Sequence, residues 1–167
     1  MNDIFSTQRL KVRKLNNNDL HDFHRLHSNK KVMQFVSPTV YTIEQSKNEI
    51  PKLIKNYDNG SDSIVYAVER IRDGVFIGTV ALIKDAYGND EIGYKIDKVY
   101  WNSGYGTELA SGLINYCKTI GLSKIVAYVA QKNTASIKII KKAGFQFLNE
   151  VLSNDLNITE YKYQLYL

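Results

Sequence analysis

The sequence predicts a single α/β domain over residues 1–167, and three observations support this prediction. The chain is long enough to bury one core, and its 44% hydrophobic and 23% charged residues are ordinary for a globular protein. Seven short segments have strand-like patterns, and others have helical spacing. Three adjacent strand-like segments are separated by turns at Asp73-Gly74 and Gly88-Asn89, which predicts an antiparallel meander.

The first half is predicted to contain a strand, two helices and the meander. Apolar and basic residues alternate over residues 9–15, as in a half-buried strand. Leu20, Phe23 and Leu26 then repeat at helical spacing behind Asn and Asp residues that favour a helix start. A second helix is expected over residues 43–57, before a run rich in turn formers. The meander strands are expected at residues 63–70, 75–84 and 91–100.

The second half alternates helices with strands. Leu109, Leu113 and Cys117 share one helix face, and Gly121 is placed to end that helix. A strand is expected at residues 123–130, and Asn133 or Thr134 can cap the helix after it. That helix is expected to end at Gly144, and the last strands are expected at residues 145–151 and 159–167.

Charge and composition exclude several classes of protein. Twenty-two Lys and Arg against 17 Asp and Glu give a formal +5, spread along the chain. This charge suits a phosphorylated cofactor, RNA or a ribosomal surface equally well, but no aromatic-rich basic strand motif predicts direct nucleic-acid binding. The single Cys117 excludes an internal disulfide framework. No apolar leader or membrane-length run is present, so we expect a cytoplasmic protein without membrane contact.

The segment "WNSGYGTELASG" at residues 101–112 predicts an anion site. Gly104 and Gly106 lie where a strand gives way to a helix, and a helix start presents unpaired N–H groups and positive dipole charge. A P-loop would need Lys-Ser/Thr after its last glycine, and a dinucleotide fingerprint would need a small residue at Leu109; neither is present. The candidate donors are the backbone N–H groups of Asn102, Ser103, Gly104, Tyr105, Gly106 and Thr107.

This loop resembles the pyrophosphate loop of the GNAT superfamily of acetyl-CoA-dependent N-acetyltransferases, Q/R-x-x-G-x-G/A. Trp101 occupies the first place, as in the RimJ/RimL-type branch of ribosomal-protein N-terminal acetyltransferases and their relatives. "EIGYKI" resembles the family's fourth strand, "STQRLKVRKL" resembles the branch's first strand, and "NTAS" with "KKAGF" resembles its next cofactor-contacting helix. The match covers nearly the whole chain.

The resemblance implies a GNAT fold and acetyl-CoA as co-substrate, with no metal. The implied sheet is central, mostly antiparallel and of about seven strands, with the fourth and fifth parallel and splayed and helices on its flanks. The splay leaves backbone groups for the pantetheine arm, by position at Ile96 and Lys98. Asn133 and Ser136 would contact the cofactor, and Lys98, Lys132 and Lys138 suit its negative charge.

For the chemistry, the resemblance points to Glu91 as the base that deprotonates the amine, although a structural carboxylate is the alternative. A backbone N–H near Ile96 or Asp97 would polarise the thioester oxygen. Ile140 stands where many relatives carry a tyrosine that protonates the leaving thiolate. Ser136 is the nearest substitute proton donor, or it only contacts the cofactor. Asn133 can bind pantetheine, cap its helix, or both.

The other chemically notable residues have simpler interpretations. His21, His24 and His27 fan around one helix without acidic or cysteine partners, so no metal site is expected. Cys117 is predicted to be a small buried apolar residue. Tyr41 and Tyr87 can line an acceptor pocket or serve packing and the surface.

The expected activity is direct acetyl transfer to a primary amine. The first expected acceptor is a protein N-terminal amine, with a ribosomal protein as the first guess. Small amines such as polyamines, amino-acid derivatives or an antibiotic are the alternatives. A non-catalytic acyl-CoA-binding regulatory module is the alternative from another class. Either a monomer or a homodimer is compatible with the sequence.

Overall fold

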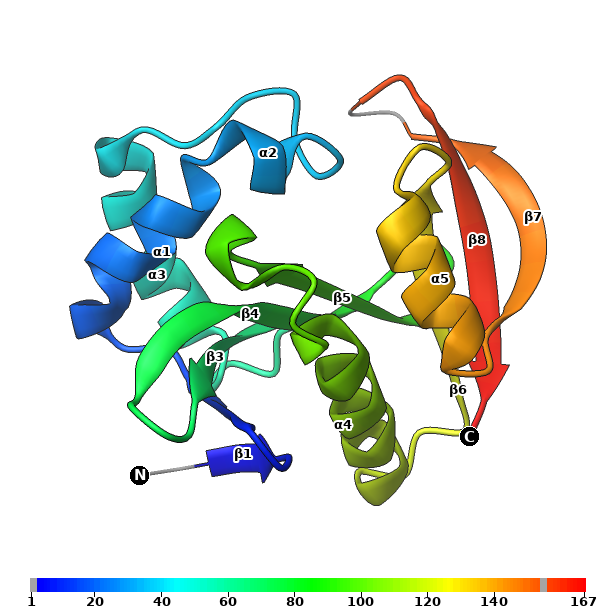
Figure 1. Ribbon diagram of the computed structural model, residues 1–167, viewed down its shortest axis with the longest axis horizontal. Helices are drawn as coiled ribbons and strands as arrows, with labels where there is room; N and C mark the ends of the chain where they lie inside the picture. The colour runs from blue at the N-terminus through cyan, green and yellow to red at the C-terminus, as the bar shows by residue number, and fades with distance from the viewer. Residues whose placement is uncertain (1–2, 154–155) are drawn as a thin grey trace.

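The computed structural model describes residues 3–153 and 156–167 and contains one eight-stranded mixed sheet in the order β1-β2-β3-β4-β5-β6-β8-β7 (Figure 1). The strands are β1 (Asp3–Ser6), β2 (Leu10–Lys14), β3 (Ser63–Arg70), β4 (Val75–Lys84), β5 (Asp90–Ile96), β6 (Lys124–Ala130), β7 (Gln146–Leu152) and β8 (Thr159–Tyr166). The helices are η1 (Asn17–Asp19), α1 (Leu20–His27), α2 (Lys30–Met33), α3 (Ile43–Lys55), η2 (Lys98–Tyr100), α4 (Tyr105–Thr119) and α5 (Thr134–Lys142).

The predicted α/β architecture and its meander are confirmed, with two differences in the sheet and two short unpredicted helices, η1 and α2. The sheet has eight strands rather than about seven, because β1 pairs with β2 and was not expected. Four residues are too few to show a reliable alternation, which explains why sequence patterning missed β1. The expected strand at residues 91–100 ends at Ile96, since residues 98–100 form η2 with Asp97 as its cap.

Within the described chain, β5 and β6 form the only parallel pair of neighbours, and their register consists of one residue pair, Glu91 with Val126. The neighbouring pairs β4–β5 and β6–β8 are antiparallel, with seven residue pairs each. The sheet is therefore divided into a β1–β5 half and a β6–β8–β7 half that meet at one point. α4 connects the two halves (Figure 1).

Helices cover both faces of the sheet and bury two separate apolar clusters. α1, α2 and α3 group at the left of the view, whereas α4 and α5 lie at its centre and right (Figure 1). Phe23, Leu26 and Ile50 belong to the cluster on the α1–α3 side. Leu109, Leu113 and Cys117 from α4 belong to the larger cluster, as their predicted helix face requires. No helix of the described residues is long and apolar enough to cross a membrane.

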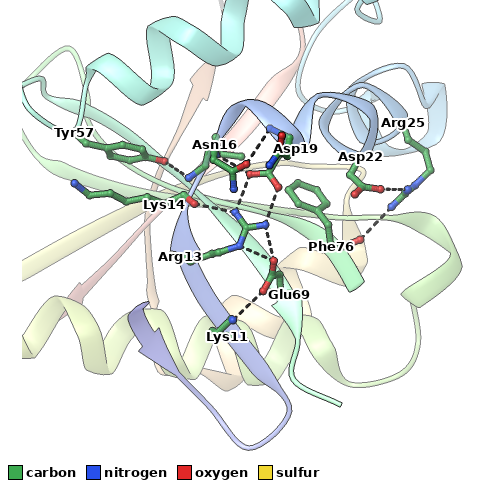
Figure 2. Close-up of polar contacts among 12 residues, drawn as sticks. Lys11, Arg13, Lys14, Asn16, Asp19, Asp22, Arg25, Tyr57, Glu69 and Phe76 are labelled. Atoms are coloured by element: carbon green, nitrogen blue, oxygen red, sulfur yellow. Dashed lines mark hydrogen bonds and ion pairs between the residues drawn. The ribbon is translucent and has the colours of Figure 1, made fainter. Parts of the chain in front are cut away.

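A buried ion network ties β2 to β3 and to the start of α1 (Figure 2). The Arg13 guanidinium donates to both carboxylate oxygens of Asp19 at 2.8 and 2.7 Å, and to Glu69 at 2.6 Å. Lys11 adds an ion pair to Glu69 at 3.2 Å. The hydrogen bonds that Arg13 donates to Asp19 and Glu69 outweigh burial and hold the pKa of Arg13 above its ordinary value. One cation thus stabilises two largely buried carboxylates.

Arg13→Met should lower the free energy of unfolding at pH 7 by roughly 3–5 kcal/mol, because it leaves buried carboxylates without their main counter-ion. Urea denaturation at pH 7 measures the loss. Lys14→Met is the matched control: its ion pair with Asp58 is exposed, at 3.8 Å, and should contribute under about 1 kcal/mol. Equal losses in the two variants would contradict the network's role.

Candidate active site

The glycine loop before α4 forms an uncapped helix start. Gly104 is the N-cap, with a left-handed φ of 80°, and no side chain caps the helix. The first backbone N–H to form a helical hydrogen bond is that of Glu108, which donates to the Gly104 carbonyl at 3.1 Å. Among the described residues, no protein acceptor pairs with the N–H groups of residues 102–107. Such a set of N–H groups at the positive end of a helix is suited to a phosphate.

Arg9, which sequence analysis did not single out, stabilises the glycine loop through hydrogen bonds. Arg9 donates to the Ser103 carbonyl at 3.0 Å and to Glu108 at 2.6 Å. Glu108 also accepts hydrogen bonds from the Thr7 hydroxyl and the Arg9 backbone N–H, at 2.6 and 2.7 Å. The guanidinium lies 4.4 Å from the centre of the Tyr105 ring, and the Tyr105 side chain is buried. These partners are about a hundred positions apart, beyond the reach of local patterns.

Trp101 has a definite structural task at the position where the family pattern has Gln or Arg. Its indole N–H donates to the Ile96 carbonyl at 2.8 Å, and its backbone N–H donates to the Lys98 carbonyl at 3.1 Å. The side chain therefore fastens the glycine loop to the end of β5.

Gly106 lies where α4 packs against α5. A Cβ there would lie 2.9 Å from Ile139 Cδ1 on α5, and 3.9 Å from the Tyr94 ring. A larger residue at this position would therefore force the end of the Ile139 side chain to move. Gly104, with its left-handed backbone, is the glycine that shapes the loop itself.

The free edge of β5 consists of the backbone N–H and C=O groups of Tyr94 and the backbone N–H of Ile96, since the Ile96 carbonyl accepts from the Trp101 indole. Asp97 N–H donates to Ile77 O at 2.8 Å, and Gly78 is the register partner of Ile96. In an antiparallel ladder this places Ile96 and Tyr94 in non-hydrogen-bonded pairs with β4, so their N–H and C=O groups point toward β6. The register of β6 reaches only Glu91, which leaves this edge without a strand partner.

This arrangement places two of the expected backbone positions, Asp97 and Lys98, off the open edge. Lys98 lies in η2, beyond the strand, and its carbonyl accepts from Trp101. The Asp97 N–H is already bonded to Ile77 and cannot polarise a thioester oxygen. Ile96 keeps its predicted place on the open edge, and Tyr94 joins it. The side chains of Lys98, Lys132 and Lys138 are exposed.

Glu91 lies at the one residue pair that joins β5 to β6, and its side chain is partly buried. Burial raises its pKa to about 7, with further increases from the charges of Asp85 and Glu160 and a decrease from Lys162. Asp85 is held as a carboxylate by hydrogen bonds from Tyr128 at 2.8 Å and Lys162 at 3.0 Å. A carboxyl group with a pKa near 7 can exchange a proton at neutral pH.

The start of α5 brings Asn133 and Ser136 together. The Asn133 side chain accepts from the Ser136 N–H at 3.2 Å, which confirms its role as helix cap. Its amide N–H₂ has no protein acceptor among the described residues, so a cofactor contact stays a prediction. Ile140, where a tyrosine acid is usual in the family, is buried.

Near Ser136 lies a buried hydroxyl that sequence analysis missed, that of Tyr94. It has no hydrogen-bond partner among the described residues. Burial raises the Tyr94 pKa, and the Ser136 side chain opposes this rise. Tyr94 thus contributes backbone groups to the open edge and a hydroxyl to the α4–α5 side.

The remaining candidates are spread over separate places. His24 contacts the Ser46 hydroxyl at 3.1 Å, and His27 is buried against β5. Burial raises the pKa of the Cys117 thiol to about 11, in line with an apolar packing role. Tyr41 packs beside His27, whereas Tyr87 is exposed in the β4–β5 turn. Across residues 3–153 and 156–167, no three His, Cys, Asp or Glu side chains gather in a group that could hold a metal ion.

The fold and this site define an α/β domain in which a phosphate-binding helix start adjoins an open strand edge. The model of the acetyltransferase (GNAT) domain matches residues 9–146. An uncharacterized N-acetyltransferase of Bacillus subtilis (strain 168), YoaA, is 29% identical over 147 residues, which cover 86% of this chain and 82% of YoaA. The chain therefore belongs to the GNAT acetyltransferase family, and it is an N-acetyltransferase of the GNAT type.

Solved structures show the same fold at low identity. RimL, a ribosomal L7/L12 α-N-protein acetyltransferase in complex with coenzyme A, aligns with a TM-score of 0.83 at 15% identity, covering 99% of this chain and 98% of RimL. A spermidine N-acetyltransferase of Vibrio cholerae in complex with CoA and spermine aligns with a TM-score of 0.80 at 22% identity, covering 95% of each chain. Because these two proteins act on different acceptors, the fold leaves the acceptor open.

Gly104→Ala should weaken the binding of coenzyme A by about tenfold or more, which corresponds to ~1.4 kcal/mol. Alanine is strained at a φ of 80°, and its Cβ would lie 3.3 Å from the Arg9 guanidinium that supports the loop. Isothermal titration calorimetry measures the change.

Gly121→Ala is the matched control for this loop variant. Gly121 lies just beyond the other end of α4, has a φ of 83°, and has open space around a Cβ. It should lose similar stability yet keep its affinity for coenzyme A. Equal affinity losses in the two variants, or none in Gly104→Ala, would contradict the assignment of the loop.

Proposed function

We propose that the chain transfers the acetyl group of acetyl-CoA directly to a primary amine, with a protein N-terminal amine as the first acceptor class. The observation that carries this proposal is Glu91: a carboxyl group with a pKa of about 7, at the pair where β5 and β6 part. A base of that pKa suits the deprotonation of an amine near neutral pH.

The cofactor fits two features of this chain. The unpaired N–H groups of residues 102–107 would hold the pyrophosphate, and the open edge at Tyr94 and Ile96 would bond the amides of the pantetheine arm. At the start of α5 the Asn133 amide N–H₂ has no acceptor among the residues that the structure describes, and Ser136 lies beside it. The bound co-substrate supplies the thioester that is attacked.

The residues divide the proton and charge transfers among them. Glu91 takes the proton that the amine must lose to attack the thioester carbonyl. A backbone N–H of Tyr94 or Ile96 is available to donate to the carbonyl oxygen as negative charge develops there. A thiol has a pKa of ~8.5, so the departing sulfur needs no strong acid. Ser136 accordingly serves as a cofactor contact, and Ile140 need not be replaced by a tyrosine acid.

Two considerations support a protein N-terminal amine. Trp101 in the glycine loop is the RimJ/RimL-type form, and the fold aligns along nearly its whole length with RimL, a ribosomal L7/L12 α-N-protein acetyltransferase. The likeness to a spermidine N-acetyltransferase supports a small amine as the second candidate. A non-catalytic acyl-CoA-binding module would lack any use for the Glu91 environment.

Glu91→Gln should reduce the acetylation rate by roughly 10²–10⁴-fold at pH 7.5 while leaving coenzyme A affinity nearly unchanged, because only the base is lost. In the unmodified protein the rate at saturation should rise with pH, with a half-rise near 7, since only the deprotonated carboxylate accepts a proton. Release of free thiol across N-terminal peptides and small amines measures the rate. Glu44→Gln, on the exposed surface of α3, is the matched control.

Lys162→Met separates the titration of Glu91 from that of the acceptor amine. Lys162 lowers the Glu91 pKa and neutralises Asp85, so its loss should move the half-rise to higher pH. The amine's own pKa is unaffected by the variant. An unshifted profile, or near-normal turnover in Glu91→Gln, would return Glu91 to a structural role. The absence of thiol release with every amine tested, despite tight binding of acetyl-CoA, would favour the non-catalytic module.

A further inference from the structure

The face of β5 that carries Glu91 also carries Gly93 and Lys95, because alternate residues of a strand share a face. Tyr94 and Ile96 point to the opposite face, toward α4 and α5. A Cβ built on Gly93 would meet no atom within 4 Å, so the surface between Glu91 and Lys95 is open. An acceptor that reaches Glu91 over Gly93 therefore meets a lysine beyond it.

Lys95 is held in place by an uncharged partner. Its ammonium nitrogen lies 3.0 Å from His27 Nε2, and His27 Nδ1 lies 2.9 Å from the Phe23 carbonyl. A carbonyl oxygen can only accept, so Nδ1 carries the hydrogen and Nε2 accepts from Lys95. Burial and the neighbouring lysine charge lower the His27 pKa to about 3, which keeps the imidazole neutral.

The imidazole itself is fixed on all sides. Its ring stacks on Phe23 with centroids 3.9 Å apart, and the Tyr41 ring lies 5.3 Å away. The Tyr41 N–H donates to the His27 carbonyl at 3.0 Å, which ties the loop before α3 to the end of α1. The direction of the Lys95 ammonium is thus set by a rigid support rather than by a flexible surface contact.

Lys95 lacks a counter-ion. No carboxylate of the described residues lies within ion-pair distance of it; Glu49 acts only through space, and its own ion pair is with Lys52 at 3.5 Å. Burial lowers the Lys95 pKa to about 8, so the charged form is held at a cost in desolvation. Lys95 as a residue is only partly buried, and the strand face beside it, over Gly93, has open space. An anion is the ligand that most stabilises such a group.

We propose that Lys95, positioned by His27, binds an acidic side chain of the acceptor, and that the acceptor is a peptide N-terminus with Asp or Glu close behind its first residue. The proposal rests on the proposed function, since Glu91 marks where the amine lies. Positions four apart in a strand are about 13 Å apart, so the amine and the acid must be separated by several bonds. A free α-amino acid is too short, and a polyamine would bring a like charge to Lys95.

Three amidated tripeptides of equal length test the proposal: Ala-Glu-Ala, Ala-Gln-Ala and Ala-Lys-Ala. We expect kcat/KM to be about tenfold or more higher for the Glu peptide than for the Gln peptide, and lowest for the Lys peptide. In Lys95→Met the preference for Glu over Gln should fall to near one, and the Lys peptide should improve. Lys47→Met, an exposed lysine on α3, is the matched control and should keep the wild-type order.

Calorimetric binding of the same peptides to the protein saturated with coenzyme A gives a readout independent of turnover. Tighter binding of the Glu peptide that is lost in Lys95→Met supports the anion site, whether or not the peptide is acetylated. A failure to acetylate any peptide would contradict the proposed function and not the anion site. Acetylation of all three peptides with equal efficiency would overturn the anion site and leave the proposed function standing. Equal binding of all three would overturn it as well. Lys95→Met should remain folded, because it replaces a desolvated cation with an apolar chain of similar length.

Discussion

A single residue pair, Glu91 with Val126, joins the two halves of the sheet, and the candidate site depends on that constraint. Beyond the pair, the backbone groups of Tyr94 and Ile96 face the space that a longer parallel ladder would close. The connection from β5 to β6 runs through the glycine loop and α4, so the uncapped helix start opens beside the same edge. Two sets of unpaired backbone donors thus adjoin one another, and both suit one long, anionic, amide-bearing ligand.

The alternation of β5 separates two sets of side chains. Tyr94 and Ile96 face α4 and α5, where the proposed cofactor contacts lie, while Glu91, Gly93 and Lys95 face the α1–α3 side. Glu91 can act at the point where both sides meet, since burial and the Asp85 charge bring its pKa to about 7. On this side the neutral His27 supports the cationic Lys95, which gives the proposed acceptor surface a positive charge.

Local signals were sufficient to predict the meander, the α4 and α5 helices, and the glycine loop, because turn residues, helical spacing and caps all act within a few positions. The contacts that complete the site are distant in sequence: Arg9 with Glu108, His27 with Lys95, and Asp85 with Lys162. No periodicity reveals such pairs in one sequence. The packing of Gly106 against Ile139, on another helix, is likewise invisible to a loop pattern.

Amide hydrogen exchange with and without coenzyme A tests the central claim most directly, because it reads each backbone N–H separately. The account predicts that protection rises at residues 102–107 and at Tyr94 and Ile96, while amides of the β3–β4 ladder such as Val68 and Val80 are unchanged. Unchanged exchange at Tyr94 and Ile96, or new protection confined to the surface between β1 and α4, would contradict it.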